Sequence, residues 1–216
     1  MNQTLSWYDK LAELYDLLTF RDKPYREARE LTIQMLDLQE GDVVVDLFCG
    51  TGVNFAAILR QIGPTGRIIA VDGSAGMLAK ARKRIQRNGW NPDQIELIEK
   101  DLGSPRADFL AGILPEGCIP KVLITLALSV FPNYGEVVAR ILAAMPEGTR
   151  FALMEVYTPE NARGAKLLDF IGAADCSRRV WEPFKARAAR YQEVWYPFQF
   201  PYVQAALVLA TGVKEK

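Results

Sequence analysis

A run of β-branched residues that leads directly into a small-residue turn constrains this chain more than any other feature. The run is Val43-Val-Val-Asp-Leu-Phe-Cys-Gly-Thr-Gly52, and a second apolar run, Ile68-Ile-Ala-Val-Asp72, ends in an acid twenty residues later. Gly50 and Gly52 can take positive φ and let a ligand approach the backbone closely. In an open α/β sheet, this spacing places a carboxylate beside a ribose. We therefore expect the chain to bind a cofactor that contains a nucleoside.

Two residues of the turn argue against a dinucleotide cofactor. Phe48 occupies the place of the first glycine in the dinucleotide fingerprint, and Asp46 lies at the mouth of the turn, where a carboxylate repels phosphate. A cofactor with a cationic or zwitterionic end suits that carboxylate better. A Rossmann-like turn that binds no nucleotide is the alternative interpretation.

At Asp46, Gly50 and Gly52 the chain resembles the class I S-adenosylmethionine-dependent methyltransferases, whose motif reads acid-x-Gly-x-Gly-x-Gly. The resemblance implies S-adenosyl-L-methionine as the cofactor. Phe48 departs from the motif, which weakens assignment to a subfamily but leaves the cofactor unchanged.

Strand and helix patterns alternate along the chain and predict a single α/β domain over residues 1–216. The resemblance implies a Rossmann-like, doubly wound, seven-stranded sheet with an antiparallel last strand. Residues 1–40 are expected to form an N-terminal helical extension, or lid, on a core of residues 41–216. Strands are expected at 43–48, 67–72, 95–100, 121–127 and 149–157, with two more within 189–212. Helices are expected at 3–20, 24–38, 53–62, 74–88, 105–114, 133–145 and 160–173.

Composition excludes several classes of protein and site. The 26 Lys and Arg residues balance 26 Asp and Glu residues, so the chain lacks the basic excess of a nucleic-acid-binding protein. It has no histidine, and Cys49, Cys118 and Cys176 lie far apart, so we expect neither a metal site nor a disulfide framework. The start lacks the features of a signal peptide, and no window reaches eighteen apolar residues. We therefore expect a reduced, cytoplasmic setting and no transmembrane segment.

The resemblance assigns further cofactor contacts to the ends of the expected strands. Asp72 would accept hydrogen bonds from both ribose hydroxyls, and Gly73 would keep space open beside the adenine. Asp101 would accept a hydrogen bond from the adenine amino group, and the backbone N–H of Leu102 would meet a nitrogen of the adenine ring. Met77 either packs on an adenine face or belongs to the core.

Two residues of the turn complete this set. Phe48 and Cys49 belong to the turn that would contact the cofactor. Cys49 is interpreted as a small loop residue rather than a nucleophile, because no base or cation is evident beside it.

The segment Thr125-Leu-Ala-Leu-Ser-Val-Phe-Pro-Asn-Tyr134 carries the information on the acceptor. It lacks the Asn/Asp-Pro-Pro-aromatic tetrad of enzymes that methylate nucleic-acid bases. It is similar to the Ser-Leu-Ser-Met-Ile-Pro-Asp-Trp stretch of betaine-lipid head-group N-methyltransferases, which are relatives of the ubiquinone/menaquinone C-methyltransferases. The similarity implies that Thr125 and Leu126 present carbonyls to the methionine end of the cofactor, and that Ser129 and Phe131 line the acceptor pocket. An ordinary buried strand and helix entry is the alternative.

The expected first helix carries the candidate catalytic residues Tyr8 and Tyr15. They are seven residues apart and so lie on one helix face. The pairs Tyr8-Asp9 and Tyr15-Asp16 match the repeated Tyr-Asp of the same methyltransferase group. One hypothesis is a lid that excludes water and stabilises a cation with aromatic faces. The other is a packed amphipathic helix whose tyrosines are core residues.

A group of basic residues crowds the expected helix 74–88, namely Lys80, Arg82, Lys83, Arg84 and Arg87. The simplest interpretation is a solvated face whose charges suit the helix C-terminus. Contact with anionic lipid, which would place the protein at a membrane surface, is the alternative.

The chemistry of the cofactor leads to a functional hypothesis. A sulfonium methyl group is already electrophilic, so the protein mainly aligns the acceptor. A neutral amine needs no base, whereas a phenol or a carbon acid usually does. Without histidine, only Tyr15, Glu155, Tyr157 or Tyr191 could serve as that base. We therefore expect methylation of an amine nitrogen on a small molecule or a lipid head group. An O- or C-methyltransferase of a phenol or quinol, a nucleic-acid methyltransferase and a non-catalytic cofactor-binding protein are the alternatives.

Overall fold

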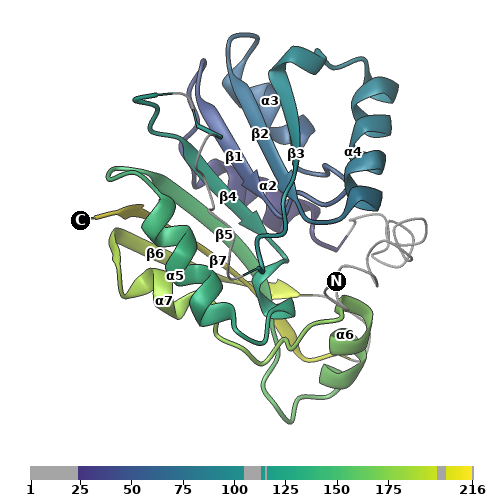
Figure 1. The fold of residues 1–216 in the computed structure, drawn as a ribbon. Coiled ribbons are helices and arrows are strands. Elements are labelled where there is room, and N and C mark those ends of the chain that lie inside the picture. Colours follow the sequence, from purple (N-terminus) through teal and green to yellow (C-terminus); the bar gives the residue numbers. More distant parts are fainter. Residues whose placement is uncertain (1–23, 105–112, 115, 199–202, 216) are drawn as a thin grey trace.

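Seven strands form one sheet in the order β3-β2-β1-β4-β5-β7-β6. The computed structural model describes residues 24–104, 113–114, 116–198 and 203–215 (Figure 1). The first five strands are parallel, β7 pairs antiparallel with β5, and β6 pairs antiparallel with β7. The strand bounds are β1 Val43–Leu47, β2 Arg67–Asp72, β3 Ile95–Glu99, β4 Lys121–Thr125, β5 Arg150–Tyr157, β6 Ala188–Phe198 and β7 Ala205–Lys214. This arrangement confirms the predicted doubly wound sheet with an antiparallel last strand.

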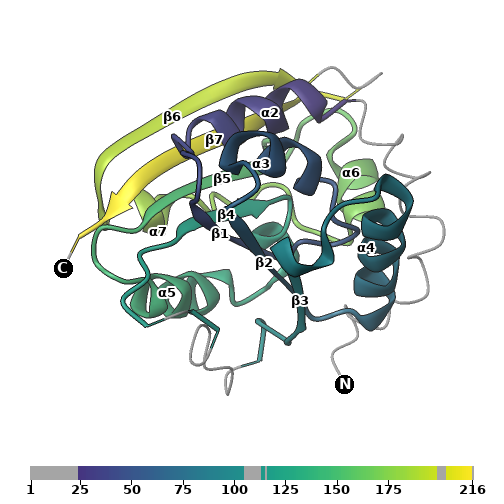
Figure 2. The ribbon, with the colours of Figure 1, turned by 90° about the horizontal axis from the view of Figure 1, so that it is seen from above.

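Helices cover both faces of the sheet, with α2, α3 and α4 on one face and α5 and α7 on the other (Figure 2). The helix bounds are α2 Arg26–Gln34, α3 Phe55–Ile62, α4 Ala75–Asn88, α5 Tyr134–Ala144, α6 Ala165–Gly172 and α7 Glu182–Lys185. Two short 3-10 helices are η2 Pro92–Gln94 and η3 Leu128–Val130.

The apolar run of β1 reflects burial on both faces of the sheet. Val44 packs in the core cluster that includes α3 and α4, whereas Val45 packs in the cluster that includes α5 and α7. Both side chains are fully buried. Strands of a parallel sheet that are covered on both faces read as continuous apolar runs rather than as alternating ones, so polar groups are confined to the strand ends.

Helix α4 starts where its cap residue predicts. The N–H of Met77 donates to Ser74 Oγ at 3.1 Å, and the helix ends at Gly89, which takes a left-handed conformation at φ 64°. The expected helix 160–173 is shorter than predicted, because Gly164 at φ 81° precedes its first residue. The short α7 was not predicted. The expected helix 3–20 lies outside the described residues, as do residues 105–112 of the expected helix 105–114.

Helix α2 belongs to the packed layers of the domain. Its Ala28 is fully buried, in one cluster with Met154 of β5 and Leu207 of β7. The hydroxyl of Thr211 on β7 lies 3.2 Å from the Met35 carbonyl, which caps the helix. The described part of the expected N-terminal extension is therefore anchored to the sheet. In the described residues, no helix combines the length and apolar character that crossing a bilayer requires.

Replacing Thr211 with Val tests this anchor, because Val keeps the shape but removes the hydroxyl. That hydroxyl also lies 2.7 Å from the Phe151 carbonyl. We expect the free energy of unfolding to fall by about 1 kcal/mol, the net worth of a buried hydrogen bond. Urea unfolding followed by circular dichroism measures it. The exposed Thr65 offers the matched Thr65→Val control, and equal stability of the two variants would show that the Thr211 hydroxyl does not stabilise this junction of α2, β5 and β7.

Candidate cofactor site

The predicted cofactor residues converge on the carboxyl edge of the parallel strands. From β1 the chain proceeds to β2 on one side, and from β3 it returns to β4 on the other side of β1. Open α/β sheets bind ligands at this reversal of strand order. The structure brings Asp46, Asp72, Asp101 and Thr125 to the carboxyl ends of these four strands or just beyond them.

The glycine-rich turn keeps the backbone shape of the motif despite its missing first glycine. Phe48 has φ 59°, beside Gly50 at φ 54° and Gly52 at φ 75°. A left-handed conformation in a residue other than glycine costs of order 1 kcal/mol and is retained where the surroundings enforce it. A Cβ atom at Gly52 would lie 2.4 Å from the Phe55 ring, whereas one at Gly50 would meet nothing within 4 Å. The space beside Gly50 is therefore open.

Asp72 closes the turn. Its Oδ2 accepts the N–H of Gly50 at 2.8 Å, and its Oδ1 accepts the N–H of Ser74 at 2.9 Å. A carboxylate has about four acceptor positions, so a ribose can still be bound. Gly73 lies between these two contacts and is half-buried.

The end of β3 forms a similar turn. Asp101 Oδ1 accepts the N–H of Gly103 at 3.0 Å, and the side chain of Leu102 is buried in the core. Met77 on α4 is also buried. The assignment of Asp101, Leu102 and Met77 to the adenine stays a prediction.

A buried polar network lies between the ends of β1 and β4. Asn54 Nδ2 donates to both oxygens of the fully buried Asp46, at 2.9 and 3.0 Å. Arg29 Nη1 donates to Asn54 Oδ1 at 2.7 Å and to Thr125 Oγ1 at 2.9 Å. The network thus joins α2, the residue that precedes α3, and both strands of the switch point.

The charge of Asp46 is costly in this setting. Burial raises the pKa of its carboxyl to about 7, although the Asn54 hydrogen bond and the Arg29 charge oppose that rise. Arg29 is 6% exposed, so a guanidinium and a carboxylate are both buried and joined through one amide. Buried ionisable groups of this kind mark functional sites more often than stabilising ones.

Sequence reasoning missed Arg29 and Asn54. Arg29 is the charged member of the buried face of α2, which otherwise consists of Ala28, Thr32 and Ile33. That position on an amphipathic helix was the available signal. Asn54 directly follows the turn and gave no signal, because its partners are distant in sequence.

The loop after β4 contains the two predicted acceptor residues. Ser129 is buried, and its hydroxyl donates to Glu155 at 3.1 Å. The Phe131 ring lies 5.3 Å from the Phe48 ring, and a Cβ atom at Gly103 would touch it. The loops after β1, β3 and β4 thus meet at Phe131. The assignment of Ser129 and Phe131 to an acceptor pocket stays a prediction.

The environments of Arg84 and Cys49 show how these two side chains should be interpreted. Arg84 is not part of a solvated face, because its Nε donates to the Thr51 carbonyl at 2.8 Å and so ties α4 to the glycine-rich turn. Cys49 is buried, which raises the pKa of its thiol well above the usual value and leaves it protonated and inert at neutral pH. In the described segments, no three His, Cys, Asp or Glu side chains gather where they could hold a metal ion.

Residues 44–145 match the family described as "Methyltransferase domain". The trans-aconitate 2-methyltransferase of Variovorax paradoxus (strain S110) is 27% identical over 97% of this chain and 81% of that relative. The ubiquinone/menaquinone biosynthesis C-methyltransferase UbiE of Pseudomonas putida (strain W619) is 26% identical over 75% of this chain. This chain spans 61% of the length of that enzyme.

Solved structures agree on the fold. The complex between the Haloferax volcanii Trm112 methyltransferase activator and a putative methyltransferase superposes with a TM-score of 0.68 at 18% identity. That match covers 97% of this chain and 98% of the other chain. The family match over residues 44–145, the curated relatives and the fold together support a methyltransferase that uses S-adenosylmethionine.

Proposed function

We propose that the protein transfers the methyl group of S-adenosyl-L-methionine to a small-molecule acceptor. The observation that carries this proposal is the buried network at the β1–β4 switch point, where Asp46 and Arg29 bear opposite charges beside the glycine-rich turn. The ends of β2 and β3, which lie beyond β1 in the sheet, add Asp72 and Asp101.

The charges of this network fit the methionine end of S-adenosylmethionine. That end carries an ammonium and a sulfonium, which suit the Asp46 carboxylate, and a carboxylate, which suits the Arg29 guanidinium. A pyrophosphate would instead bring two negative groups toward Asp46 and Asp72, which repel them. The network therefore supports a zwitterionic cofactor over a dinucleotide.

The residues of this chain would orient the reaction rather than supply its reactive group. When bound, S-adenosylmethionine supplies an electrophilic methyl group. Asp72 would hold the ribose, Asp101 and Leu102 the adenine, and Asp46 and Arg29 the methionine end. The protein then has to align the acceptor and keep water away.

An amine nitrogen on a small molecule or a lipid head group is the acceptor we propose. Histidine is absent from the sequence, and Glu155 is fully buried with three donors on its carboxylate, so it does not face an acceptor as a base. A neutral amine needs no base. The relative named as a C-methyltransferase favours a carbon acceptor as the second candidate. Radiolabelled methyl transfer to amines, phenols, quinols and phospholipid vesicles distinguishes the two, because only one class should incorporate label.

The protein should bind S-adenosylhomocysteine and not NAD in calorimetry, and Asp72→Ala should weaken that binding. Losing charged hydrogen bonds to a ribose costs about 1.5–3 kcal/mol. Glu99 pairs with Asp72 across β2 and β3 but is exposed, so Glu99→Ala is the matched control and should bind as the wild type does. Because Asp72 also closes the turn, thermal unfolding is measured on the same preparations. An unchanged dissociation constant in a folded Asp72→Ala variant would show that the ribose contact is misassigned.

The buried charge of Asp46 should make stability depend on pH in a defined window. The pKa of Asp46 is about 7 in the folded protein and 3.8 in the unfolded chain, so the folded state holds this proton more tightly. The contribution of that proton to the free energy of unfolding is therefore complete below pH 3.8 and is lost as the pH rises to 7. The Asp46→Asn variant does not titrate there. Its free energy of unfolding, relative to wild type, should rise by up to about 4 kcal/mol across the window. Denaturation at closely spaced pH values measures this, and parallel curves for the two proteins would refute it.

We also propose that residues 3–20, which lie outside the described residues, form a lid over the acceptor pocket, with Tyr15 nearest the methyl group. Tyr15→Ala should then lower methyl transfer far more than stability, and binding of S-adenosylhomocysteine should persist. If Tyr15 were a core residue, its truncation to Ala would instead lower the free energy of unfolding by about 3–5 kcal/mol. Melting temperature and methyl transfer are compared on one preparation. A large fall in melting temperature with a proportionate loss of activity would remove the lid.

A further inference from the structure

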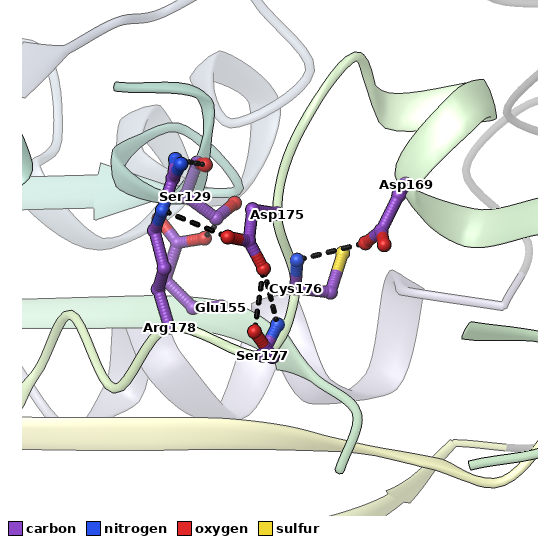
Figure 3. A network of polar contacts seen from close by, with 7 residues as sticks. All are labelled: Ser129, Glu155, Asp169, Asp175, Cys176, Ser177 and Arg178. Atoms are coloured by element: carbon purple, nitrogen blue, oxygen red, sulfur yellow. Dashed lines mark hydrogen bonds and ion pairs between the residues drawn. The ribbon is translucent and has the colours of Figure 1, made fainter. Parts of the chain in front are cut away.

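A buried carboxylate holds the loop between β4 and α5. Glu155 on β5 is fully buried, and its Oε1 accepts the N–H groups of Ala127 at 2.8 Å and Leu128 at 2.7 Å. Its Oε2 accepts the Ser129 hydroxyl at 3.1 Å (Figure 3). All three donors are neutral. One side chain thus fixes three consecutive residues of the loop that follows Thr125.

The opposite side of Ser129 is held by the segment between α6 and α7. The Ser129 carbonyl accepts Arg178 Nη1 at 2.7 Å and the N–H of Asp175 at 3.0 Å. Arg178 Nε pairs with Asp175 Oδ2 at 3.2 Å, and Asp169 on α6 accepts the N–H of Cys176 at 2.9 Å (Figure 3). Ser129 is therefore clamped between Glu155 and this segment.

This loop is built at a cost to stability. Leu126 has φ 55°, a conformation that residues other than glycine rarely adopt. Burial raises the pKa of Glu155 to about 6, even though its hydrogen bonds to the Ala127–Ser129 segment favour the charged form. An apolar side chain of similar volume would avoid the desolvation of a charge. A strained residue and a buried carboxylate in one loop indicate that the conformation of the loop serves something other than folding.

We infer that Glu155 is a positioning residue of the methyl-transfer site, which fixes the loop Leu126–Ser129 beside the methionine end of the cofactor. The inference rests on the proposed function. The loop leaves β4 at Thr125, whose hydroxyl joins the network of Asp46 and Arg29, and the N–H of Leu126 donates to the Met154 carbonyl at 2.8 Å. Glu155 acts through the backbone of the loop and does not touch the acceptor. Its charge strengthens the two amide hydrogen bonds, because charge-assisted bonds are about twice as strong as neutral ones.

The groups around Glu155 define what its protonation changes. Asp175 and Arg178 lie beside it on the segment before α7, whereas the Cys176 thiol points toward Asp169 on α6 (Figure 3). Oε1 already accepts two N–H groups, so an added proton sits on Oε2, and the Ser129 hydroxyl turns to accept it. Glu155→Gln reproduces this state, because its amide nitrogen takes the place of Oε2. The variant keeps the shape and both amide contacts but loses the charge.

The test measures S-adenosylhomocysteine binding by calorimetry between pH 5 and pH 8 for wild type and Glu155→Gln. At pH 8 we expect the variant to bind about three- to tenfold more weakly, with an equal or higher melting temperature. The ratio of the two affinities should approach one at pH 5, where the wild-type carboxyl is protonated. Asp46 titrates in both proteins, so the ratio isolates Glu155. Glu160→Gln, at an exposed position of the following loop, is the matched control and should keep wild-type affinity at every pH.

Glu155→Ala removes all three contacts and should weaken binding more than Glu155→Gln at every pH. If Glu155→Ala does not fold, the pH dependence of the affinity ratio between wild type and Glu155→Gln still tests the positioning role. A ratio of one at pH 8, or a ratio that does not change with pH, overturns the positioning role while leaving the proposed function in place. Failure of the wild type to bind S-adenosylhomocysteine overturns the proposed function and this inference together.

Discussion

The contact between Asn54 and the buried carboxylate of Asp46 is the interaction on which the site depends. One amide group satisfies both oxygens of Asp46, and its own oxygen receives Arg29. Without these partners, a carboxylate at the centre of a sheet covered on both faces would be protonated or expelled. The network also connects α2, α3, β1 and β4, so the same bonds that retain a charge at the switch point hold the layers in register.

The architecture explains why the polar groups gather at one edge. The middles of β1, β2 and β4 are covered on both faces, and their side chains are apolar. Buried carboxylates lie near the strand ends, where loop N–H groups or a side-chain amide can donate to them. Asp72 and Asp101 each accept N–H groups of their own loops, and Glu155 accepts those of the loop after β4. Each carboxylate both shapes a loop and leaves negative potential at the site.

The sequence predicted the parts of this structure that depend on local pattern. β2 begins and ends as predicted, Ser74 caps α4, and the two C-terminal strands pair as expected. Patterns of burial and capping extend over a few residues, so they can be recognised in a single sequence. Arg29 and Thr125 are 96 residues apart, and Glu155 lies 27 residues from Leu128. Such pairs exist only once the sheet has formed. Arg84 was misjudged for the same reason, because its partner Thr51 is on another element.

The two strained residues of the site have complementary positions. Phe48 after β1 and Leu126 after β4 are both left-handed, and each is followed by a loop that a carboxylate holds, Asp72 for the first and Glu155 for the second. The rings of Phe48 and Phe131 bring the two loops into contact. At Phe48, where the motif has a glycine, the aromatic ring contacts Phe131 in the loop after β4, a contact that glycine has no side chain to make.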